Sequence, residues 1–242
     1  MEIPGLDPVP QQTLELLHEV STATLATTLF KLGLKNRALT NVRAVVPASR
    51  MVGEALTVRY IPMREDLDTY ERLAEPDYLH RTVFDVISPG QVLVLDARGD
   101  VSGSLLGDIL AMRLKQRGAA GVVTDGCVRD GSAIRGVGLP CYARGDHPNA
   151  TFHLHHAVDM NVPIACAGVA VYPGDIVVGD SDGVVVIPRH LAASVAQSGH
   201  AQEQIEAFIL QKVAAGAPLR GTYPPNEATR AEFQTWRESQ QK

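Results

Sequence analysis

Hydrophobic positions recur at helical spacing near both ends of the chain. Between residues 11 and 32, leucine and valine side chains follow one another every few positions, which predicts one helix, or two short ones, ending at Gly33. If there are two helices, Ser21 or Thr22 caps the second. Residues 189–215 show similar spacing, and the glycine that follows ends this predicted helix. Helices are therefore expected before and after a central region with a different pattern.

The first part of that central region is typical of strands. Residues 43–60 are rich in β-branched side chains and are interrupted by Pro47 and Gly53, which predicts strands and a turn. The clearest strand covers residues 55–61. Residues 64–82 are polar and charged, and we expect a surface helix and a loop there.

The most regular pattern predicts a βαβ unit. An apolar run at 91–97 indicates a buried strand, 105–117 has helical spacing, and 120–126 indicates a second strand. Such units almost always join parallel strands by a right-handed crossover. A helical turn and a strand at 140–143 are expected to follow.

Short runs of valine and isoleucine then alternate with turn residues. The runs cover 162–168, 169–180 and 183–189. Turns are expected at Pro173–Asp175 and at Asp180–Gly183, so the pattern predicts a meander of antiparallel strands. The expected fold is α/β, with a central mixed sheet that contains the βαβ unit and the meander and is flanked by helices.

Composition supports one globular domain over residues 1–242. Of these residues 45% are hydrophobic and 20% are charged, which excludes disordered and low-complexity classes. A chain of this length can bury a substantial core without disulfides. The polar residues 216–242 are interpreted as an arm that clasps a partner or as a frayed tail.

Charge and cysteine content narrow the possible partners. The net charge is −5 and the basic residues are scattered, which argues against a broad nucleic-acid surface. The amino terminus lacks the pattern of a signal peptide, and no apolar stretch approaches the ~20 residues of a membrane helix. The three cysteines lack C-x-x-C spacing. We expect a soluble cytoplasmic protein that binds neither nucleic acid nor membrane.

Candidate chemistry gathers around the βαβ unit. Asp108 lies in the first turn of the predicted helix, and Arg129 and Asp130 follow the second strand. The carboxyl ends of parallel strands share one edge of a sheet, so these side chains can face one pocket. Arg129 can bind an anion with its guanidinium fork, and Asp130 can hold a hydrated divalent cation. The alternative is a helix cap at Asp108 and a surface ion pair.

The helix start offers a second anion-binding group. Backbone N–H groups in the first turn of a helix have no partner within the helix, and the helix dipole favours negative charge there. A small carboxylate or phosphate is therefore expected to bind the helix start. The residues concerned are Gly107, Asp108, Ile109 and Leu110.

Other polar residues are interpreted as structural. Cys127 has no histidine base near it in the sequence and is expected to be a small buried side chain. Asp175, Asp180 and Asp182 belong to turn sequences. One histidine group has two members on one strand face without a third ligand, which favours surface or subunit contacts over a metal site. Its members are His153, His155 and His156.

Three motifs together resemble a known family. The first is G-D-I-L-A, nine residues, then G-V-V-T-D-G-x-V-R-D. L-P-x-Y-A-R-G and P-G-D-I-V-V-G-D-x-D-G-V-V-V-I-P follow. The chain resembles the RraA-like family over about residues 15–215. This family includes 4-hydroxy-4-methyl-2-oxoglutarate and 4-carboxy-4-hydroxy-2-oxoadipate aldolases.

The resemblance implies a compact fold, assembled as homotrimers or homohexamers with active sites at the subunit interfaces. It also implies a divalent cation, Mg²⁺ or Mn²⁺, that helps to hold the pyruvate part of the substrate. Carried over, Arg129 binds pyruvate, Asp130 is the metal ligand, partly through water, and the helix start at 107–110 binds the carboxylate. Asp108 helps to position a metal-bound water that acts as the base. A glutamate from a neighbouring subunit assists it, with Glu203 and Glu206 as candidates.

The resemblance therefore implies a lyase that releases pyruvate from a small anionic 2-oxo acid, by aldol cleavage or by decarboxylation of oxaloacetate. The alternative is a non-catalytic regulator that binds a ribonuclease or another protein, as one family member does. A methyltransferase is excluded because no Gly-rich loop follows the first strand.

One segment departs from the shorter relatives. The polar insert at 64–78 is expected to shape the pocket rim or the subunit contacts. Whether it contributes Arg64 or Arg72 to a second substrate carboxylate is left open. Arg144 is another candidate, with a salt bridge as its structural interpretation.

Overall fold

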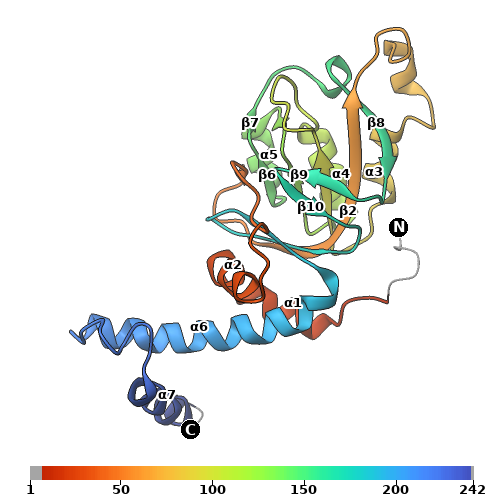
Figure 1. Cartoon of the computed structure of the whole chain (residues 1–242). Helices are drawn as coiled ribbons and strands as arrows, with labels where there is room; N and C mark the ends of the chain where they lie inside the picture. The colour runs from red at the N-terminus through yellow and green to blue at the C-terminus, as the bar shows by residue number, and fades with distance from the viewer. Residues whose placement is uncertain (1–6, 241–242) are drawn as a thin grey trace.

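The computed structural model describes residues 7–240, which form an eight-stranded mixed sheet with helices around it (Figure 1). The strand order is β1-β6-β4-β3-β2-β11-β12, and β8 also pairs with β2. The strands are β1 (Arg43–Ala44), β2 (Met51–Pro62), β3 (Gln91–Asp96), β4 (Gly121–Thr124), β6 (Cys141–Ala143), β8 (His155–Met160), β11 (Ile176–Gly179) and β12 (Val184–Ile187). The α/β prediction is confirmed.

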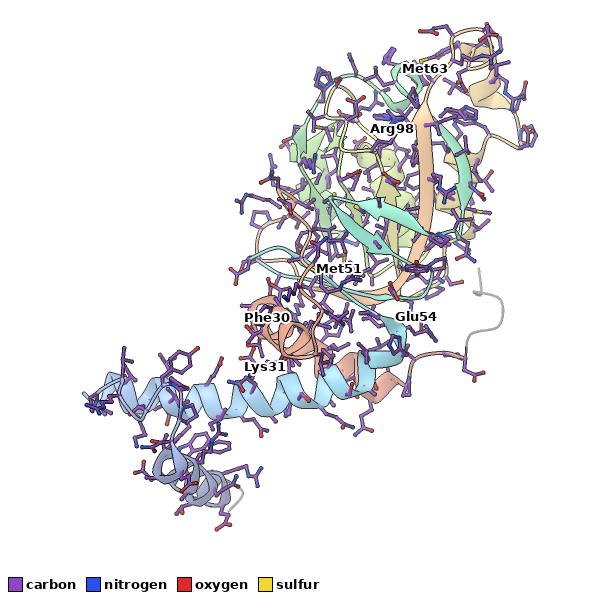
Figure 2. All side chains as sticks on the ribbon, in the orientation of Figure 1. Phe30, Lys31, Met51, Glu54, Met63 and Arg98 are labelled. Atoms are coloured by element: carbon purple, nitrogen blue, oxygen red, sulfur yellow. The ribbon has the colours of Figure 1, made fainter. Side chains whose placement is uncertain are left out.

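The predicted βαβ unit is present. Strands β2, β3, β4 and β6 pair in parallel, and α4 (Asp108–Gln116) connects β3 to β4. β3 is buried at every position, as its continuous apolar run predicts. Strand β2 runs through the body of the protein, from Met51 at one end to just before Met63 at the other (Figure 2).

Different elements cover the two faces of the sheet. Leu93 and Leu95 of β3 pack in one hydrophobic cluster with residues of three helices. These helices are α3 (Leu79–Val86), α4 and α5 (Gly131–Val137). Val92 and Val94 pack in another cluster with a small two-stranded sheet. This sheet consists of β9 (Ile164–Cys166) and β10 (Val169–Val171). Because the side chains of β3 point alternately to the two faces of the sheet, they pack in two separate core layers.

The predicted meander is only partly right. β9 pairs with β10 in a separate sheet, whereas β11 pairs with β12 and with β2 in the main sheet. The predicted run at 169–180 is therefore two strands in different sheets. The chain turns between β9 and β10 at Ala167 and Gly168, whose φ angles of 49° and 81° suit a two-residue hairpin. Pairing of this kind is set by the whole fold and cannot be seen in local spacing.

Two short helices occupy the first predicted helical region. They are α1 (Gln11–His18) and α2 (Thr22–Lys31), and Ser21 caps α2 by accepting a hydrogen bond from Thr24 N at 3.1 Å. Both pack against α6 (Ala192–Ala214) in a third apolar cluster. Of the alternatives that the sequence left open, the structure has two helices and not one, and Ser21 and not Thr22 is the cap.

The C-terminal segment is more ordered than a frayed tail. Residues Glu227–Gln240 form α7, and α6 extends beyond the body with α7 beside its C-terminal part (Figure 1). Phe208 of α6 lies 5.8 Å from Phe233 and 5.5 Å from Trp236 between ring centroids. No helix among residues 7–240 combines the length and hydropathy needed to cross a membrane.

The remaining elements are short. They are η1 (Tyr70–Ala74), β5 (Cys127–Val128), β7 (Gly145–Asp146), η2 (Thr151–His153) and η3 (Arg189–Leu191). Residues 64–82 contain η1, loops and the start of α3, close to the prediction. Helix α3 is amphipathic, with His80, Val83 and Phe84 buried.

Gly53 lies inside β2 and not at a turn as predicted. A Cβ atom at this position would overlap the carbonyl oxygen of Gly90 and would lie 3.1 Å from Ala120 Cβ. The glycine therefore allows a close backbone approach within a continuous strand.

Gly53→Ala is expected to lower the free energy of unfolding by about 1–3 kcal/mol, because backbone atoms must move to admit the methyl group. Gly136→Ala is the matched control, since nothing lies within 4 Å of its added Cβ and it is in α5. The control should leave stability unchanged or raise it by up to about 1 kcal/mol. Urea denaturation measures both, and equal midpoints would contradict this packing.

Candidate active site

Backbone hydrogen bonds join two loops at the site, the loop before α4 and the loop after β5. Leu105 N donates to Cys127 O at 2.9 Å, and Arg129 N donates to Leu106 O at 2.9 Å. This pairing keeps residues 104–106 out of the helix, so α4 begins at Asp108 and not near Leu105 as predicted. These hydrogen bonds also fix Arg129 beside the N-terminus of α4.

Gly107 brings the two loops into contact. It precedes α4 as the N-cap residue, and no side chain caps the helix there. A Cβ atom at Gly107 would lie 2.7 Å from Asp130 Oδ2 and 3.1 Å from Arg129 Nε. The structure therefore brings together Gly107, Arg129 and Asp130, as the sequence predicts.

The first turn of α4 retains donors for an anion. Among residues 7–240, no acceptor bonds the N–H groups of Asp108 and Leu110. The N–H of Ile109 differs, because it donates to Asp108 Oδ1 at 2.8 Å. The helix start that is predicted to bind an anion thus keeps at least two donors, whereas the N–H of Ile109 is occupied by the carboxylate of Asp108.

Arg129 and Asp130 form a partly exposed pair. Arg129 Nε lies 3.4 Å from Asp130 Oδ2, and the two side chains are 45% and 44% exposed. Asp130 has a left-handed backbone, with φ 58°, and precedes α5 without capping it. Its carboxylate instead lies against Gly107 and Arg129. A non-glycine residue in this conformation is uncommon and is often found at functional sites.

A second carboxylate lies close to Asp130. Asp146 and Asp130 line one hollow of about 370 Å³, which Arg129 and His147 also line. A Cβ atom at Gly131 would overlap a carboxylate oxygen of Asp146. Asp146 could not be predicted from the sequence, because it reaches the site through the parallel pairing of β5 with β7, which no local pattern reveals.

The donor set suits a hard cation that keeps its own water. Asp130 and Asp146 supply carboxylate oxygens beside an open hollow. Mg²⁺ commonly binds through one or two carboxylates and retains several waters. No group of three or more His, Cys, Asp or Glu side chains gathers as a metal cage within the described part of the chain. The residues present therefore fit a weakly coordinated Mg²⁺ or Mn²⁺.

Arg129 also lines a second, larger cavity beside the start of α4. This cavity has a volume of about 470 Å³ and lies between α3, the start of α4 and η2. Gly107 and Asp108 line it, and Tyr78 and Phe152 contribute aromatic side chains to its walls. The start of α4 thus opens into a space that is larger than a three-carbon acid requires.

His80 lines this cavity as a neutral imidazole. Its pKa is lowered to about 3, first by burial and then by His155 and Arg81. Tyr60 Oη lies 2.7 Å from His80 Nδ1, and Thr151 Oγ1 lies 3.3 Å from Nε2. His80 therefore holds the cavity wall in place and does not carry charge at neutral pH.

The cysteine, histidine and aspartate residues that the sequence indicated to be structural have surroundings that fit this interpretation. Burial raises the pKa of Cys127, and Asp146 and Asp100 add to that shift, so the thiol stays protonated. His153 lies in η2 and not on the predicted strand. His155 contacts Arg98, and His156 contacts Asp68. Asp180 binds Thr22 and Arg50.

The candidate glutamates lie on α6, at one end of the molecule, whereas α4 and α5 lie in the body (Figure 1). Glu203 Oε1 accepts hydrogen bonds from Ser21 N at 2.9 Å and Ser21 Oγ at 2.7 Å. Glu206 Oε1 accepts from Gln202 Nε2 at 2.7 Å. Within one chain neither reaches Arg129, so their role at a neighbouring subunit's site stays a prediction.

The comparison with known families identifies the class of protein. Residues 22–186 match the RraA-like family model, described as Aldolase/RraA. This match covers more than half of the chain, and the chain belongs to the RraA-like family. The predicted resemblance is confirmed, and the motif residues around Gly107 and Arg129 lie inside the matched region.

Individual relatives carry two kinds of name. A protein of Halalkalibacterium halodurans named "Putative 4-hydroxy-4-methyl-2-oxoglutarate aldolase" is 42% identical over 110 residues, which is 46% of this chain and 52% of the relative. The chain thus spans about half the length of this curated relative. Streptomyces coelicolor RraAS2, described as an unusual member of the RNase ES inhibitor RraA protein family, has a TM-score of 0.75 at 33% identity, covering 84% of this chain and 98% of that one.

A third comparison extends over most of the fold. The crystal structure of an uncharacterized protein from Pseudomonas syringae pv. tomato has a TM-score of 0.78 at 28% identity. The match covers 90% of this chain and all of that chain (100%). The sheet and its flanking helices are therefore those of an RraA-like fold.

The contacts of Glu203 predict a pH dependence of stability. Partial burial alone raises the pKa of Glu203, but the hydrogen bonds from Ser21 outweigh it, and the net shift is downward from 4.5. A lowered folded-state pKa contributes stability above about pH 4.5 that is lost as the pH falls through the folded-state value. Glu203→Gln should lower the free energy of unfolding at neutral pH by about 1–2 kcal/mol and flatten its decline in acid.

Urea denaturation between roughly pH 3 and pH 7 measures this effect, since the linkage appears as a pH-dependent free energy. Glu206→Gln is the control, because among residues 7–240 the Glu206 carboxylate bonds only to Gln202, on the same helix. A pH profile for Glu203→Gln that parallels the unmodified chain would show that the contact with Ser21 does not stabilise the fold.

Proposed function

We propose that this chain is a lyase that cleaves a carbon–carbon bond of a small anionic 2-oxo acid and releases pyruvate. The reaction is an aldol cleavage of a substrate like 4-hydroxy-4-methyl-2-oxoglutarate, or the decarboxylation of oxaloacetate. The observation that carries the proposal is the position of Arg129 beside the unbonded N–H groups of Asp108 and Leu110. The name of the relative that is 42% identical supports it.

These groups match the charge that the reaction develops. Breaking the bond next to a 2-oxo acid leaves the enolate of pyruvate, and its negative charge must be stabilised as it forms. The two N–H groups at the start of α4 bind the carboxylate of the pyruvate part. The guanidinium of Arg129 then faces the adjoining oxo group and stabilises the enolate.

A divalent cation completes the proposed site. Asp130, with Asp146 beside it, would hold Mg²⁺ or Mn²⁺ largely through water. When bound, the cation supplies Lewis-acid stabilisation of the developing negative charge. Arg129 keeps Asp130 in place through their ion pair at 3.4 Å.

Aldol cleavage also needs a group that accepts the proton of the 4-hydroxyl group. Asp108 lines the cavity beside the start of α4, and its Oδ1 accepts a hydrogen bond from Ile109 N. We assign to this carboxylate the positioning of the water that accepts the proton, assisted by Glu203 or Glu206 from a second copy. Ile109 is 77% exposed and Met112 is 43% exposed on the same helix, as a subunit contact beside the site requires. A homotrimer or homohexamer is the proposed assembly.

The similarity to RraAS2 favours one other function, the binding and inhibition of a ribonuclease. The net charge of −5 would complement a basic RNA-binding surface. Salt-sensitive binding to a ribonuclease, together with no turnover of any 2-oxo acid, would select this function over the lyase.

Loss of pyruvate release in site variants tests the lyase. Arg129→Ala should lower kcat/KM for oxaloacetate and for 4-hydroxy-4-methyl-2-oxoglutarate by about 100- to 1,000-fold, because the enolate loses a charged donor. Asp130→Asn and EDTA should each remove most activity, and added Mg²⁺ should reverse only the effect of EDTA. Pyruvate is measured with a coupled dehydrogenase assay.

Arg135→Ala is the matched control, because it removes an exposed guanidinium from α5 without touching the site. Its activity should equal that of the unmodified chain. Full activity of Arg129→Ala would rule out the assigned site, and full activity in EDTA would rule out the cation.

A further inference from the structure

The cavity beside the start of α4 has room for more than the pyruvate part of a substrate. Its volume of about 470 Å³ lies within the roughly 300–1,000 Å³ of small-molecule sites. Leu106 and Leu110 flank the helix start, and both pack in or against one hydrophobic cluster with Phe84 of α3. All three side chains line the cavity. An apolar wall therefore begins directly beside the unbonded N–H groups of Asp108 and Leu110.

Aromatic rings make up a further part of the wall. Tyr78 comes from the polar insert and Phe152 from η2, and both line the cavity. Phe152 lies 5.9 Å from Tyr70 between ring centroids, in an edge-to-face contact. Thr151 Oγ1 donates to Ser104 O at 2.9 Å. This hydrogen bond ties the segment that carries Phe152 to the loop that leads into α4.

The buried polar side chains of the wall are bonded within the protein. His80 Nδ1 lies 2.7 Å from Tyr60 Oη, and its Nε2 lies 3.3 Å from Thr151 Oγ1. Ser104 Oγ donates to Asn149 O at 2.6 Å. The imidazole, the threonine hydroxyl and the serine hydroxyl are thus satisfied without a ligand, so they do not require a polar group beside them.

The charged side chains at the cavity, apart from those assigned to the pyruvate end, are exposed to solvent. They are Arg81, Asp85 and Arg113. Arg113 Nε donates to Asp85 Oδ1 at 2.6 Å. Water screens charges that face it, so such groups add little to binding. The buried part of the cavity therefore favours an apolar group over a second carboxylate, which would lose its water against an apolar wall.

The arginines that the sequence left open for a second substrate carboxylate have other partners. Arg64 and Arg72 each form an ion pair with a carboxylate of the insert itself, at 2.6 and 2.7 Å. Arg144 donates to a backbone carbonyl oxygen. None of these three lines the cavity. The insert contributes Leu73 and Tyr78 to its walls instead.

We propose that this cavity binds a bulky apolar group on C4 of the substrate, so that the substrate class is a 4-hydroxy-2-oxo acid with an apolar end. This inference rests on the proposed function and narrows it, because Arg129 and the start of α4 then hold the pyruvate end. Removing the apolar group from water supplies the binding energy, and the aromatic walls favour a ring in edge-to-face contact. Phe152 is a specificity residue in this assignment.

The cleavage of such a substrate balances. The bond between C3 and C4 breaks, and its electron pair forms the enolate of pyruvate. The proton of the 4-hydroxyl group passes to the water that Asp108 positions, and C4 leaves as the carbonyl carbon of an apolar aldehyde. A proton added at C3 then gives pyruvate.

Binding tests the inference without turnover. 2-Oxo-4-phenylbutanoate, 2-oxopentanoate and 2-oxoglutarate share the 2-oxo acid end and carry a phenyl group, a methyl group and a carboxylate on C4. None has the 4-hydroxyl group that aldol cleavage needs. With Mg²⁺ present, calorimetry should show that the unmodified chain binds the phenyl compound about 10- to 100-fold more tightly than 2-oxopentanoate. 2-Oxoglutarate should bind no more tightly than 2-oxopentanoate.

Two substitutions of Phe152 change the wall in opposite ways. Phe152→Ala should weaken binding of the phenyl compound about 10-fold and leave that of 2-oxopentanoate unchanged. Phe152→Arg should shift the preference toward 2-oxoglutarate, because a guanidinium on the wall can bind its second carboxylate. Phe30→Ala is the matched control, since Phe30 is 61% exposed on α2 and lies at the other end of the body from Met63, which precedes the insert (Figure 2). It should bind all three ligands as the unmodified chain does.

Kinetics give the matching readout. Aldol cleavage of 4-hydroxy-2-oxo-4-phenylbutanoate and of 4-hydroxy-2-oxoglutarate yields pyruvate from each, with benzaldehyde and glyoxylate as the other products. The unmodified chain should have a KM about 10- to 100-fold lower for the phenyl compound. Phe152→Ala should raise this KM about 10-fold and leave the KM for the diacid unchanged.

The outcomes separate this inference from the proposed function. Binding of 2-oxoglutarate as tightly as the phenyl compound, or an equal loss of all three ligands in Phe152→Ala, would overturn the apolar site. A preference for the phenyl compound that depends on Phe152, without cleavage of any 2-oxo acid, would overturn the lyase and support the apolar site. Cleavage of the diacid with no gain from the phenyl group would leave the lyase standing and reject the apolar site.

Discussion

The whole site depends on one close approach between two loops. The loop before α4 and the loop after β5 are held by backbone hydrogen bonds, and at Gly107 there is no room for a side chain. Because of this approach, a guanidinium and a carboxylate from one loop lie beside the helix start of the other. Positive charge, negative charge and unbonded N–H groups are thereby placed within one small volume. Binding an anion there costs little rearrangement, since the donors are already in position.

The sheet provides the rigid frame for this approach. Strands β3 and β4 are buried at every position and carry the two loops at their carboxyl ends. In open α/β sheets this edge is where ligands bind. The helices α3, α4 and α5 cover one face and also border the site, so the same packing supports the fold and positions the chemistry. The hairpin of β9 and β10 covers the other face.

Local sequence patterns predict the βαβ unit and the site residues that it brings together, but they do not predict contacts between distant segments. The apolar run of β3, the spacing of α4 and the R-D step after the next strand lie within about 40 residues, so their meeting followed from the βαβ rule. The position of Asp146 and the pairing of β9 with β10 depend on contacts between segments that local spacing does not encode. The start of α4 was placed too early because residues 104–106 pair with a distant strand and stay out of the helix. Gly53 was read as a turn because a glycine that permits a close approach looks the same in sequence as one that permits a turn.

The central claim is that the start of α4 and Arg129 together bind the pyruvate part of a 2-oxo acid. A crystal structure of the chain with pyruvate and Mg²⁺ tests it most directly. The account predicts the pyruvate carboxylate on the N–H groups of Asp108 and Leu110, its oxo group beside Arg129, and the cation beside Asp130. Pyruvate bound away from the start of α4, or a cation bound without Asp130, would contradict it.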